Sequence, residues 1–238
     1  METLYLKISD ATIIPSPYVK NLFTKLLPKS KYFYIELGVK KGLTHFSKQK
    51  TEQNNNLLFV GSIERRKGLI YLLEALNILT KKEVTFHCNI VGKVIDECYF
   101  KMLEKKVEQF GLQNKITFCG RVSEEQLSEY YNNSYCFVFP SLLEGYGMVL
   151  IEAMSYGLPI VAFDNSAMPY TVKHGENGLL AENKNTKTLA KSIANILANP
   201  SLRQKLSDGA LHSYGNARSF ADMDKEIDEI CQTHFVVQ

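Results

Sequence analysis

The sequence of 238 residues has no tryptophan, and its five cysteines are scattered along the chain. None of them forms a CxxC pair, so the spacing of a zinc site or of a disulfide framework is absent, and free thiols buried in a reducing compartment are the simplest interpretation. No run of apolar residues reaches the roughly 18 that a membrane span requires. The first ten residues, METLYLKISD, lack a basic stretch followed by an apolar core. We therefore expect no signal peptide and a cytoplasmic location.

The chain also lacks a large excess of charge of either sign. Its 28 basic and 25 acidic residues give a net charge of +3, which does not supply the concentrated basic face that nucleic-acid binding needs. Peripheral contact with anionic membranes is the most that this charge allows. Hydrophobic residues make up 45% of the sequence, which is enough for a core. At about 150 residues per domain, the length predicts one large domain, or one domain with a fragment of another.

Residues 1–56 differ in character from the rest. The stretch DATIIPSPYVKNLFTKLL predicts a short strand, a Pro-Ser-Pro break and a helix, and KYFYIELGV predicts a strand that ends at Gly38. Residues 47–56, SKQKTEQNNN, are polar and rich in asparagine, which is typical of a linker or a long loop. We therefore place a domain boundary between residues 56 and 57.

From Leu57 onward, short apolar strands alternate with helices. The predicted strands are LLFVG, VTFHCNIVG, KITFCG, YCFVFP and PIVAFD, and further helices are expected over residues 186–198, 199–213 and 217–233. Continuous apolar strands that alternate with helices are typical of a parallel sheet covered on both faces. The predicted fold is therefore a doubly wound, Rossmann-like α/β domain. Because such folds bind ligands beyond the carboxyl ends of their strands, the loops of interest are 61–67, 92–95, 120–123, 140–147 and 164–169.

The first of these loops is strongly basic. Arg65, Arg66 and Lys67 stand directly before a predicted helix, where acidic residues are usually preferred. A helix start attracts anions through its free N–H groups. Three added cations favour a polyphosphate ligand, although a solvated basic turn would look the same in a sequence.

A second loop carries two glutamates in otherwise apolar or glycine-rich sequence, PSLLEGYGMVLIEAM. Glu144 ends the loop and Glu152 falls in the second turn of the helix that starts near Gly147 or Met148. A carboxylate accepts two hydrogen bonds, which suits a vicinal diol, and the helix start between the two carboxylates suits a phosphate. This combination matches a nucleotide diphosphate sugar. The alternative is that Glu144 only favours the helix dipole and Glu152 is a solvated helix residue.

The Glu-x7-Glu pattern with Gly-x-Gly inside it, after a strand that ends in Phe-Pro-Ser, resembles the retaining glycosyltransferases of family four, which have the GT-B fold. The resemblance covers about residues 10–230. FVGSIERRKGLIYLLEAL, ITFCGRVSEEQLSEYY and VKHGENGLLAE follow the order of that family's C-terminal, nucleotide-sugar-binding domain. Residues 10–46 resemble the end of the other GT-B domain and the segment between the two.

The resemblance implies a role for several residues. Lys67 would hold the donor pyrophosphate and stabilise charge on the leaving group, and Glu144 would contact the transferred sugar, so these two are the catalytic candidates. Glu152 would bind the ribose hydroxyls. Arg121 and Val122 would lie against the base.

The remaining implied binding residues surround the start of the helix. The backbone at Gly145, Tyr146 and Gly147 would approach the sugar and phosphate, and Met148 belongs to the same set. The family usually has arginine where this chain has Ser62, and Arg65 or Arg66 is the candidate to replace it through space.

Two further departures from the family pattern concern larger features. Residues 165–170, NSAMPY, lack the acidic residue that the family often has after this strand. The first GT-B domain, which would complete the catalytic cleft and carry the acceptor site, has only a remnant in residues 1–46.

The sequence therefore predicts a retaining glycosyltransferase that moves a sugar from a UDP-, GDP- or ADP-sugar to a glycan or lipid acceptor, with this chain as the donor-binding half. No metal and no other cofactor is expected, because positive side chains and a helix dipole can neutralise a diphosphate. The alternatives are a subunit of a split enzyme whose first domain is on another polypeptide, a truncated protein that binds donor without turnover, and a non-enzymatic binding or scaffold protein.

Overall fold

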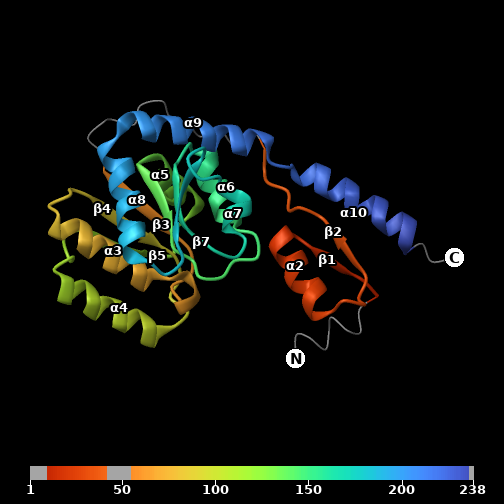
Figure 1. The fold of residues 1–238 in the computed structure, drawn as a ribbon, viewed down its shortest axis with the longest axis horizontal. Helices are drawn as coiled ribbons and strands as arrows, with labels where there is room; N and C mark the ends of the chain where they lie inside the picture. Colours follow the sequence, from red (N-terminus) through yellow and green to blue (C-terminus); the bar gives the residue numbers. More distant parts are fainter. Residues whose placement is uncertain (1–9, 42–54, 236–238) are drawn as a thin grey trace.

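The computed structural model describes residues 10–41 and 55–235 (Figure 1). Its centre is a six-stranded sheet in the order β5-β4-β3-β6-β7-β8, in which every neighbouring pair is parallel. The strands are β3 (Asn56–Val60), β4 (His87–Val91), β5 (Ile116–Gly120), β6 (Cys136–Phe139), β7 (Ile160–Asp164) and β8 (Gly178–Glu182). The strand order reverses between β3 and β6, so these two neighbours send their following helices to opposite faces of the sheet.

The apolar runs of the sequence form the central strands. Leu57, Leu58 and Phe59 of β3 have no exposed surface, and all four residues of β6 are buried as well. A strand buried on both faces has no polar side to expose. This is why the runs are continuous rather than alternating, and the predicted doubly wound α/β fold is confirmed.

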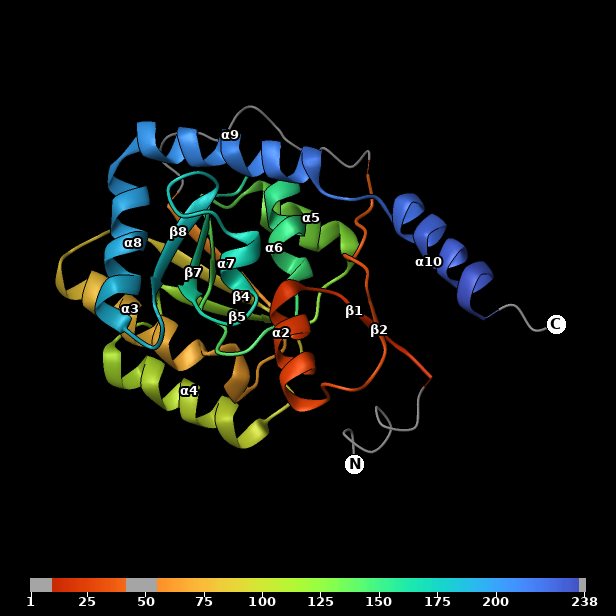
Figure 2. The same ribbon diagram turned by 45° about the vertical axis from the view of Figure 1, so that its right-hand side comes forward.

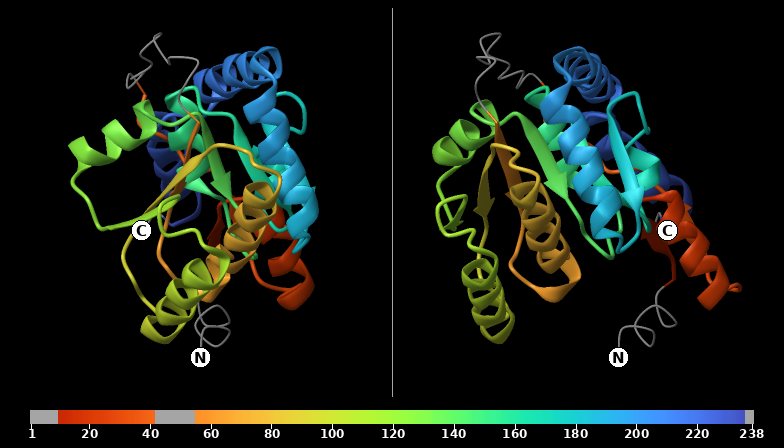
Figure 3. Two further views of the ribbon diagram at one scale, coloured as in Figure 1. Left: turned by 90° about the vertical axis from the view of Figure 1, so that its left-hand side faces the viewer. Right: turned by 60° about the vertical axis from the view of Figure 1, so that its left-hand side comes forward.

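Helices cover both faces of the sheet (Figure 3). The main ones are α3 (Leu69–Lys81), α4 (Glu97–Phe110), α5 (Glu124–Asn132), α6 (Met148–Ser155), α8 (Thr186–Ala198) and α9 (Pro200–Asn216). On one face α3 packs between α4 and α8, and at the other α6 packs against α9. As predicted, Ser123 and Gln126 form a capping box at the start of α5, and Gly111 ends α4 in a left-handed conformation.

One strand of the main sheet and one short α-helix were not predicted. Strand β8 pairs with β7 along its whole length, but its sequence, GLLAE, offers only three apolar residues after a turn. Helix α7 (Met168–Thr171) has four residues and a proline in its first turn. Neither segment is long enough for a periodic pattern to show in the sequence.

Residues 10–37, here called the N-terminal unit, form a separate small body (Figures 1 and 2). It consists of β1 (Thr12–Ile14), α2 (Pro17–Leu26) and β2 (Tyr32–Tyr34), and the two strands are parallel. The predicted strand KYFYIELGV is therefore shorter than expected. The unit has its own hydrophobic cluster of Ile14, Phe23 and Leu27.

Helix α10 (Phe220–His234) runs beside the N-terminal unit, where the ring of Phe33 lies 5.0 Å from that of His234. The chain crosses between the two bodies twice, and Val39 pairs with Ser219 at the crossing. Most of the predicted linker lies outside the described residues, and Asn56, which was assigned to it, is the first residue of β3. Within the described ranges, no helix combines the length and apolarity needed to cross a bilayer.

The cysteines are less buried than the sequence suggested. All five are free, but only Cys88 and Cys136 are buried, whereas Cys98 and Cys231 are exposed. Cys98 and Cys231 lie on α4 and α10, whose outer faces contact solvent, so the expectation of five buried thiols was wrong. Burial raises the pKa of the Cys88 thiol, which makes it a poor nucleophile.

Gly68 lies between a single 3-10 turn (η1, Arg65–Lys67) and α3. A substitution there tests the close packing of this turn on the loop after β6, which positions Lys67. Its φ is +68°, and a Cβ there would lie 2.0 Å from the carbonyl oxygen of Pro140. Gly111 has nearly the same φ, +65°, with no atom within 4 Å of a Cβ. In urea unfolding, Gly111→Ala should cost about 1–2 kcal/mol, the strain of a left-handed alanine. Gly68→Ala should cost clearly more, because the loop after β6 must also move. Equal losses would show that this close approach is not required.

Candidate functional site

The three cations of the basic loop all have acidic partners. Arg65 lies 3.4 Å from Asp96, and Arg66 donates to Glu64 at 2.9 Å. Lys67 forms an ion pair with Glu144, from the loop after β6. The loop is therefore not the free basic turn that its sequence suggests.

Glu144 joins the two loops through one oxygen. Its Oε1 accepts from Lys67 Nζ, from Arg66 Nη1 at 3.0 Å and from Ser141 Oγ at 2.9 Å. The side chains of Lys67 and Glu144 are only 12% and 13% exposed, so the pair is shielded from water. All hydrogen bonds found for this carboxylate in the described part of the chain use Oε1, and Oε2 stays available to a ligand.

Backbone contacts fix the same junction. Leu142 N donates to the carbonyl of Arg66 at 2.8 Å, and Glu144 N donates to Ser166 Oγ at 3.1 Å. Ala167 N in turn donates to the carbonyl of Glu144 at 3.2 Å. The loops that follow β3, β6 and β7 are thereby tied together at the carboxyl end of the sheet.

The start of α6 lies directly after this junction. Its N-cap residue, Gly147, has φ 89° and makes no side-chain capping bond. A helix without a side-chain cap has free N–H groups in its first turn, and these with the helix dipole favour an anion. Glu144, Lys67 and the start of α6 therefore place a cation, a carboxylate and an anion-binding helix end together.

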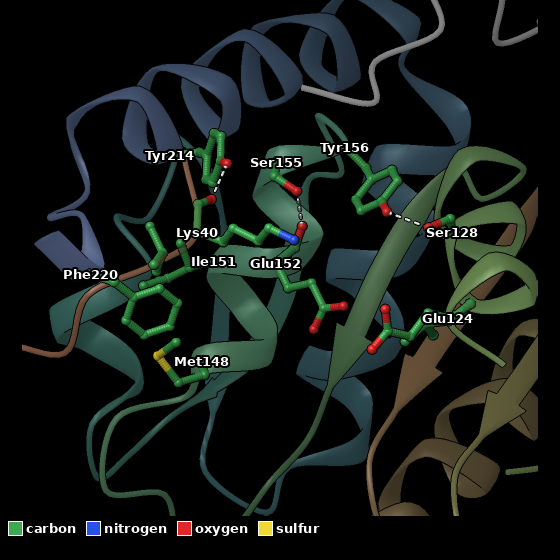
Figure 4. A pocket seen from close by; sticks show the side chains of 12 residues that line it. Lys40, Glu124, Ser128, Met148, Ile151, Glu152, Ser155, Tyr156, Tyr214 and Phe220 are labelled. Atoms are coloured by element: carbon green, nitrogen blue, oxygen red, sulfur yellow. Dashed lines mark hydrogen bonds between the residues drawn. The ribbon is translucent and has the colours of Figure 1, made fainter. Parts of the chain in front are cut away.

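Glu152 occupies different surroundings. It lines a pocket of about 490 Å³ beside α6, together with Met148, Ile151 and residues of α5. In Figure 4 the carboxylates of Glu124 and Glu152 face each other across this pocket. Neither Glu144 nor Lys67 lines it.

Burial and charge act on the pocket carboxylate. Desolvation raises the pKa of Glu152, the nearby Tyr131 hydroxyl lowers it, and the charge of Glu124 raises it further. The Tyr131 hydroxyl is buried and makes no hydrogen bond of good geometry, and burial and Glu152 raise its pKa. The site thus holds a carboxylate that has few donors of its own and would gain from a ligand that donates hydrogen bonds.

The predicted site residues fall into four places. Arg66, Lys67 and Glu144 are together, and Met148 and Glu152 share the pocket. The predicted base-binding residues follow β5: Arg121 is exposed and Val122 packs partly on the core. Gly145 and Tyr146 lead from the ion pair toward the N-terminal unit.

Sequence reasoning missed Ser141, Ser166 and Glu64. Ser141 and Ser166 each follow a buried strand at the ligand end of the sheet. That position was a usable signal for both serines. The pairing of Glu64 with Arg66 is local, two residues apart, and acid-base spacing in a turn does not reveal it. Among residues 10–41 and 55–235, no group of three or more His, Cys, Asp and Glu side chains is arranged to hold a metal ion.

The family model of the glycosyl transferases group 1 matches residues 41–212. The chain belongs to this family. The resemblance read from the Glu-x7-Glu stretch is thereby confirmed.

The sequence is similar to those of two uncharacterized glycosyltransferases. An uncharacterized glycosyltransferase of Haemophilus influenzae is 36% identical over 157 residues, which is 66% of this chain and 43% of that protein. A second, from Methanocaldococcus jannaschii, is 30% identical over 204 residues, 84% of this chain and 53% of that protein. The chain thus spans about half the length of these relatives.

Solved structures of GT-B glycosyltransferases share the fold. Sucrose-phosphate synthase from Thermosynechococcus elongatus superposes with a TM-score of 0.86 at 23% identity, over 100% of this chain and 61% of that one. A glycosyltransferase from Rickettsia africae gives 0.85 at 21% identity, over 99% and 67%. The expected GT-B architecture is confirmed by these matches.

The raised pKa of Glu152 predicts a pH dependence of stability. A carboxyl that binds protons more tightly in the folded state makes the protein less stable as pH rises from below its unfolded pKa through its folded pKa. Glu152→Gln should therefore gain stability relative to the parent over this pH range, and the gain should be constant above it. Glu125, whose pKa is lowered by a hydrogen bond with Ser123, is the control. Glu125→Gln should lose stability relative to the parent as pH rises through the folded and unfolded pKa of Glu125. Urea unfolding from pH 3 to 8 measures the free energy of unfolding of both variants and the parent. A pH-independent difference for Glu152→Gln would contradict the assignment.

Proposed function

We propose that this chain is the donor-binding half of a retaining glycosyltransferase, which moves a sugar from a nucleotide diphosphate sugar to a glycan or lipid acceptor. The observation that carries the proposal is the Lys67–Glu144 pair next to the uncapped start of α6. A cation and free helix N–H groups suit a diphosphate, and the adjacent carboxylate suits sugar hydroxyls.

Because three donors share one oxygen of Glu144, Lys67 can exchange this carboxylate for a ligand at a small cost in free energy. When a diphosphate arrives, Lys67 can turn to it while Arg66 and Ser141 still donate to Oε1. The carboxylate is then not left buried and unpaired, which would be strongly destabilising. Lys67 and the start of α6 would next stabilise the negative charge that builds on the diphosphate as it leaves.

The pocket at Glu152 would take the nucleoside. Its carboxylate would accept from both ribose hydroxyls, and the base would extend toward the loop of Arg121 and Val122. A structural neighbour, HepE of Anabaena, has been solved with UDP and glucose, at 18% identity and a TM-score of 0.85. That complex supports the class of donor, and UDP, GDP and ADP are all candidates.

The partner that completes the cleft would contact the N-terminal unit. Three apolar side chains of this unit are exposed: Ile13 (50%), Leu26 (61%) and Tyr34 (39%). Its sheet has only two strands, which are parallel, and it lacks the covering layers that parallel sheets normally have. We infer that a further α/β unit, from the same or another polypeptide, extends the β1–β2 sheet and brings the acceptor site.

A donor-binding role predicts distinct effects for three substitutions. Glu152→Gln should weaken both free nucleotide and nucleotide sugar about tenfold or more, since hydrogen bonds to charged groups contribute roughly 1.5–3 kcal/mol. Glu144→Gln should weaken the nucleotide sugar and spare the free nucleotide. Lys67→Ala should weaken diphosphates more than monophosphates. Arg65→Ala removes a cation of the same loop outside the pair, and should bind like the parent.

Calorimetry with nucleoside mono- and diphosphates and the matching sugar nucleotides measures all four variants. If no nucleotide binds to the folded parent, the donor-binding proposal fails and the scaffold alternative is favoured. If both glutamate variants bind every ligand like the parent, the two charges are structural.

The proposal that a further domain completes the catalytic cleft predicts the outcome of an activity assay. The 238-residue chain alone should transfer sugar from a bound sugar nucleotide to an acceptor only negligibly, because holding donor and acceptor in one cleft provides much of the rate. Product formation from radiolabelled UDP-, GDP- and ADP-sugars measures this. Robust transfer by the purified chain without any partner would overturn the half-site proposal. Binding of the sugar nucleotide without turnover, both alone and with every candidate partner protein added, would favour a non-catalytic donor-binding protein.

A further inference from the structure

The loop that carries Glu144 is joined to the N-terminal unit by two hydrogen-bonding contacts. Ser16 Oγ donates to the carbonyl of Gly145, and Tyr146 OH points at Glu36 Oε1 and at the carbonyl of Leu37, each at 3.2 Å. The sequence positions of the partners differ by more than 100 residues. These contacts begin one and two residues after Glu144, so they act on the segment between the ion pair and the start of α6.

In each contact, one of the two residues makes a further hydrogen bond of its own. Ser16 is 1% exposed and also caps α2 by accepting from Val19 N at 3.1 Å. The backbone carbonyl of Tyr146 accepts from Thr171 Oγ1 of α7 at 3.4 Å. A displacement of the N-terminal unit would therefore also move the backbone of residues 145–147, because the side chains that connect them are not free to rotate.

The rest of this interface is loosely packed. The buried cluster of Ile14, Phe23 and Leu27 is separate from the core of the larger domain. Between the two bodies lies a crevice of about 110 Å³, lined by Tyr34, Tyr170 and other polar or small residues. Tyr18 of α2 packs against the core of the larger domain, but the buried cores of the two bodies do not merge. The hydrogen bonds of Ser16 and Tyr146 are therefore the polar contacts that orient the unit on the loop.

Tyr146 is suited to remain a donor. Burial, and then the nearby charge of Glu36, raise the pKa of its hydroxyl, so it keeps its proton over the ordinary pH range. Tyrosine and phenylalanine differ only in this hydroxyl, so Tyr146→Phe removes the contact and leaves the ring in place.

We propose that Tyr146 is a positioning residue that couples the seating of the N-terminal unit to the conformation of the donor-binding loop. With Ser16, it makes the placement of residues 10–37 and the arrangement of Glu144 and the start of α6 depend on one another. This coupling rests on the proposed donor-binding function for its role, and it is reciprocal: a ligand that orders the loop also favours the seated unit.

The first experiment needs no ligand. Amide hydrogen exchange of the full chain should be faster in Tyr146→Phe than in the parent, both in β1, β2 and α2 and in the first turn of α6, by about threefold or more. Tyr170→Phe removes a hydroxyl from the same crevice that makes no hydrogen bond in the described structure, and should leave both regions unchanged. Glu36→Gln keeps an oxygen that accepts from Tyr146, and should also resemble the parent. Faster exchange on one side only, or the same change in both phenylalanine variants, would overturn the coupling.

The second experiment adds UDP, GDP or ADP, whichever calorimetry shows to bind. At saturation the nucleotide should slow exchange in β1, β2 and α2 of the parent, although these elements are outside the pocket, and this slowing should be lost in Tyr146→Phe. Binding with no slowing in the parent, or with slowing retained in the variant, would overturn the coupling. Failure of all three nucleotides to bind would instead refute the proposed function, and the ligand-free result would still decide the coupling.

Discussion

The site depends on the ion pair between Lys67 and Glu144. It joins the loops that follow β3 and β6, at the point where the strand order of the sheet reverses. Topology alone would leave a crevice there, because the helices after these two strands leave toward opposite faces. The pair sets the chemistry of that crevice. Its charges are nearly buried, so Lys67 requires an anionic partner, either Glu144 or a ligand that replaces it.

Sharing of one carboxylate oxygen distinguishes this arrangement from a simple salt bridge. Arg66 and Ser141 hold the same oxygen as Lys67, so the cation can leave without stranding the anion. Glu152 lies in a separate pocket beside α6, with Glu124 across from it. The two glutamates of one short stretch therefore lie in different environments, because Glu144 has three donors on one oxygen and Glu152 has few donors. This contrast is the physical basis for assigning them different ligand groups.

Much of the fold could be predicted from the sequence because local patterns suffice for it. Apolar runs and caps such as Ser123–Gln126 identified five strands of the main sheet and the helices between them. Strand β8 was missed because its three apolar residues gain their strand identity from pairing with β7.

The site was only partly predictable, for a related reason. Residue types and helix position pointed to Lys67, Glu144 and Glu152, but the pairing of Arg65 with Asp96 and the contact of Tyr146 with Glu36 connect distant segments. No local pattern encodes such contacts. The exposure of Cys98 and Cys231 was likewise set by which helix faces meet solvent.

The separation of Lys67 and Glu144 by 77 positions also bears on how the protein folds. Strands β4 and β5 with their helices lie between the two residues in sequence, whereas β3 and β6 are neighbours in the sheet. Pairing of such distant segments closes a long loop, and contacts of this kind slow folding. The ion pair cannot form before β6 docks on β3. A nucleotide that binds there would recognise only the nearly complete sheet, and would slow unfolding while leaving the rate of folding almost unchanged.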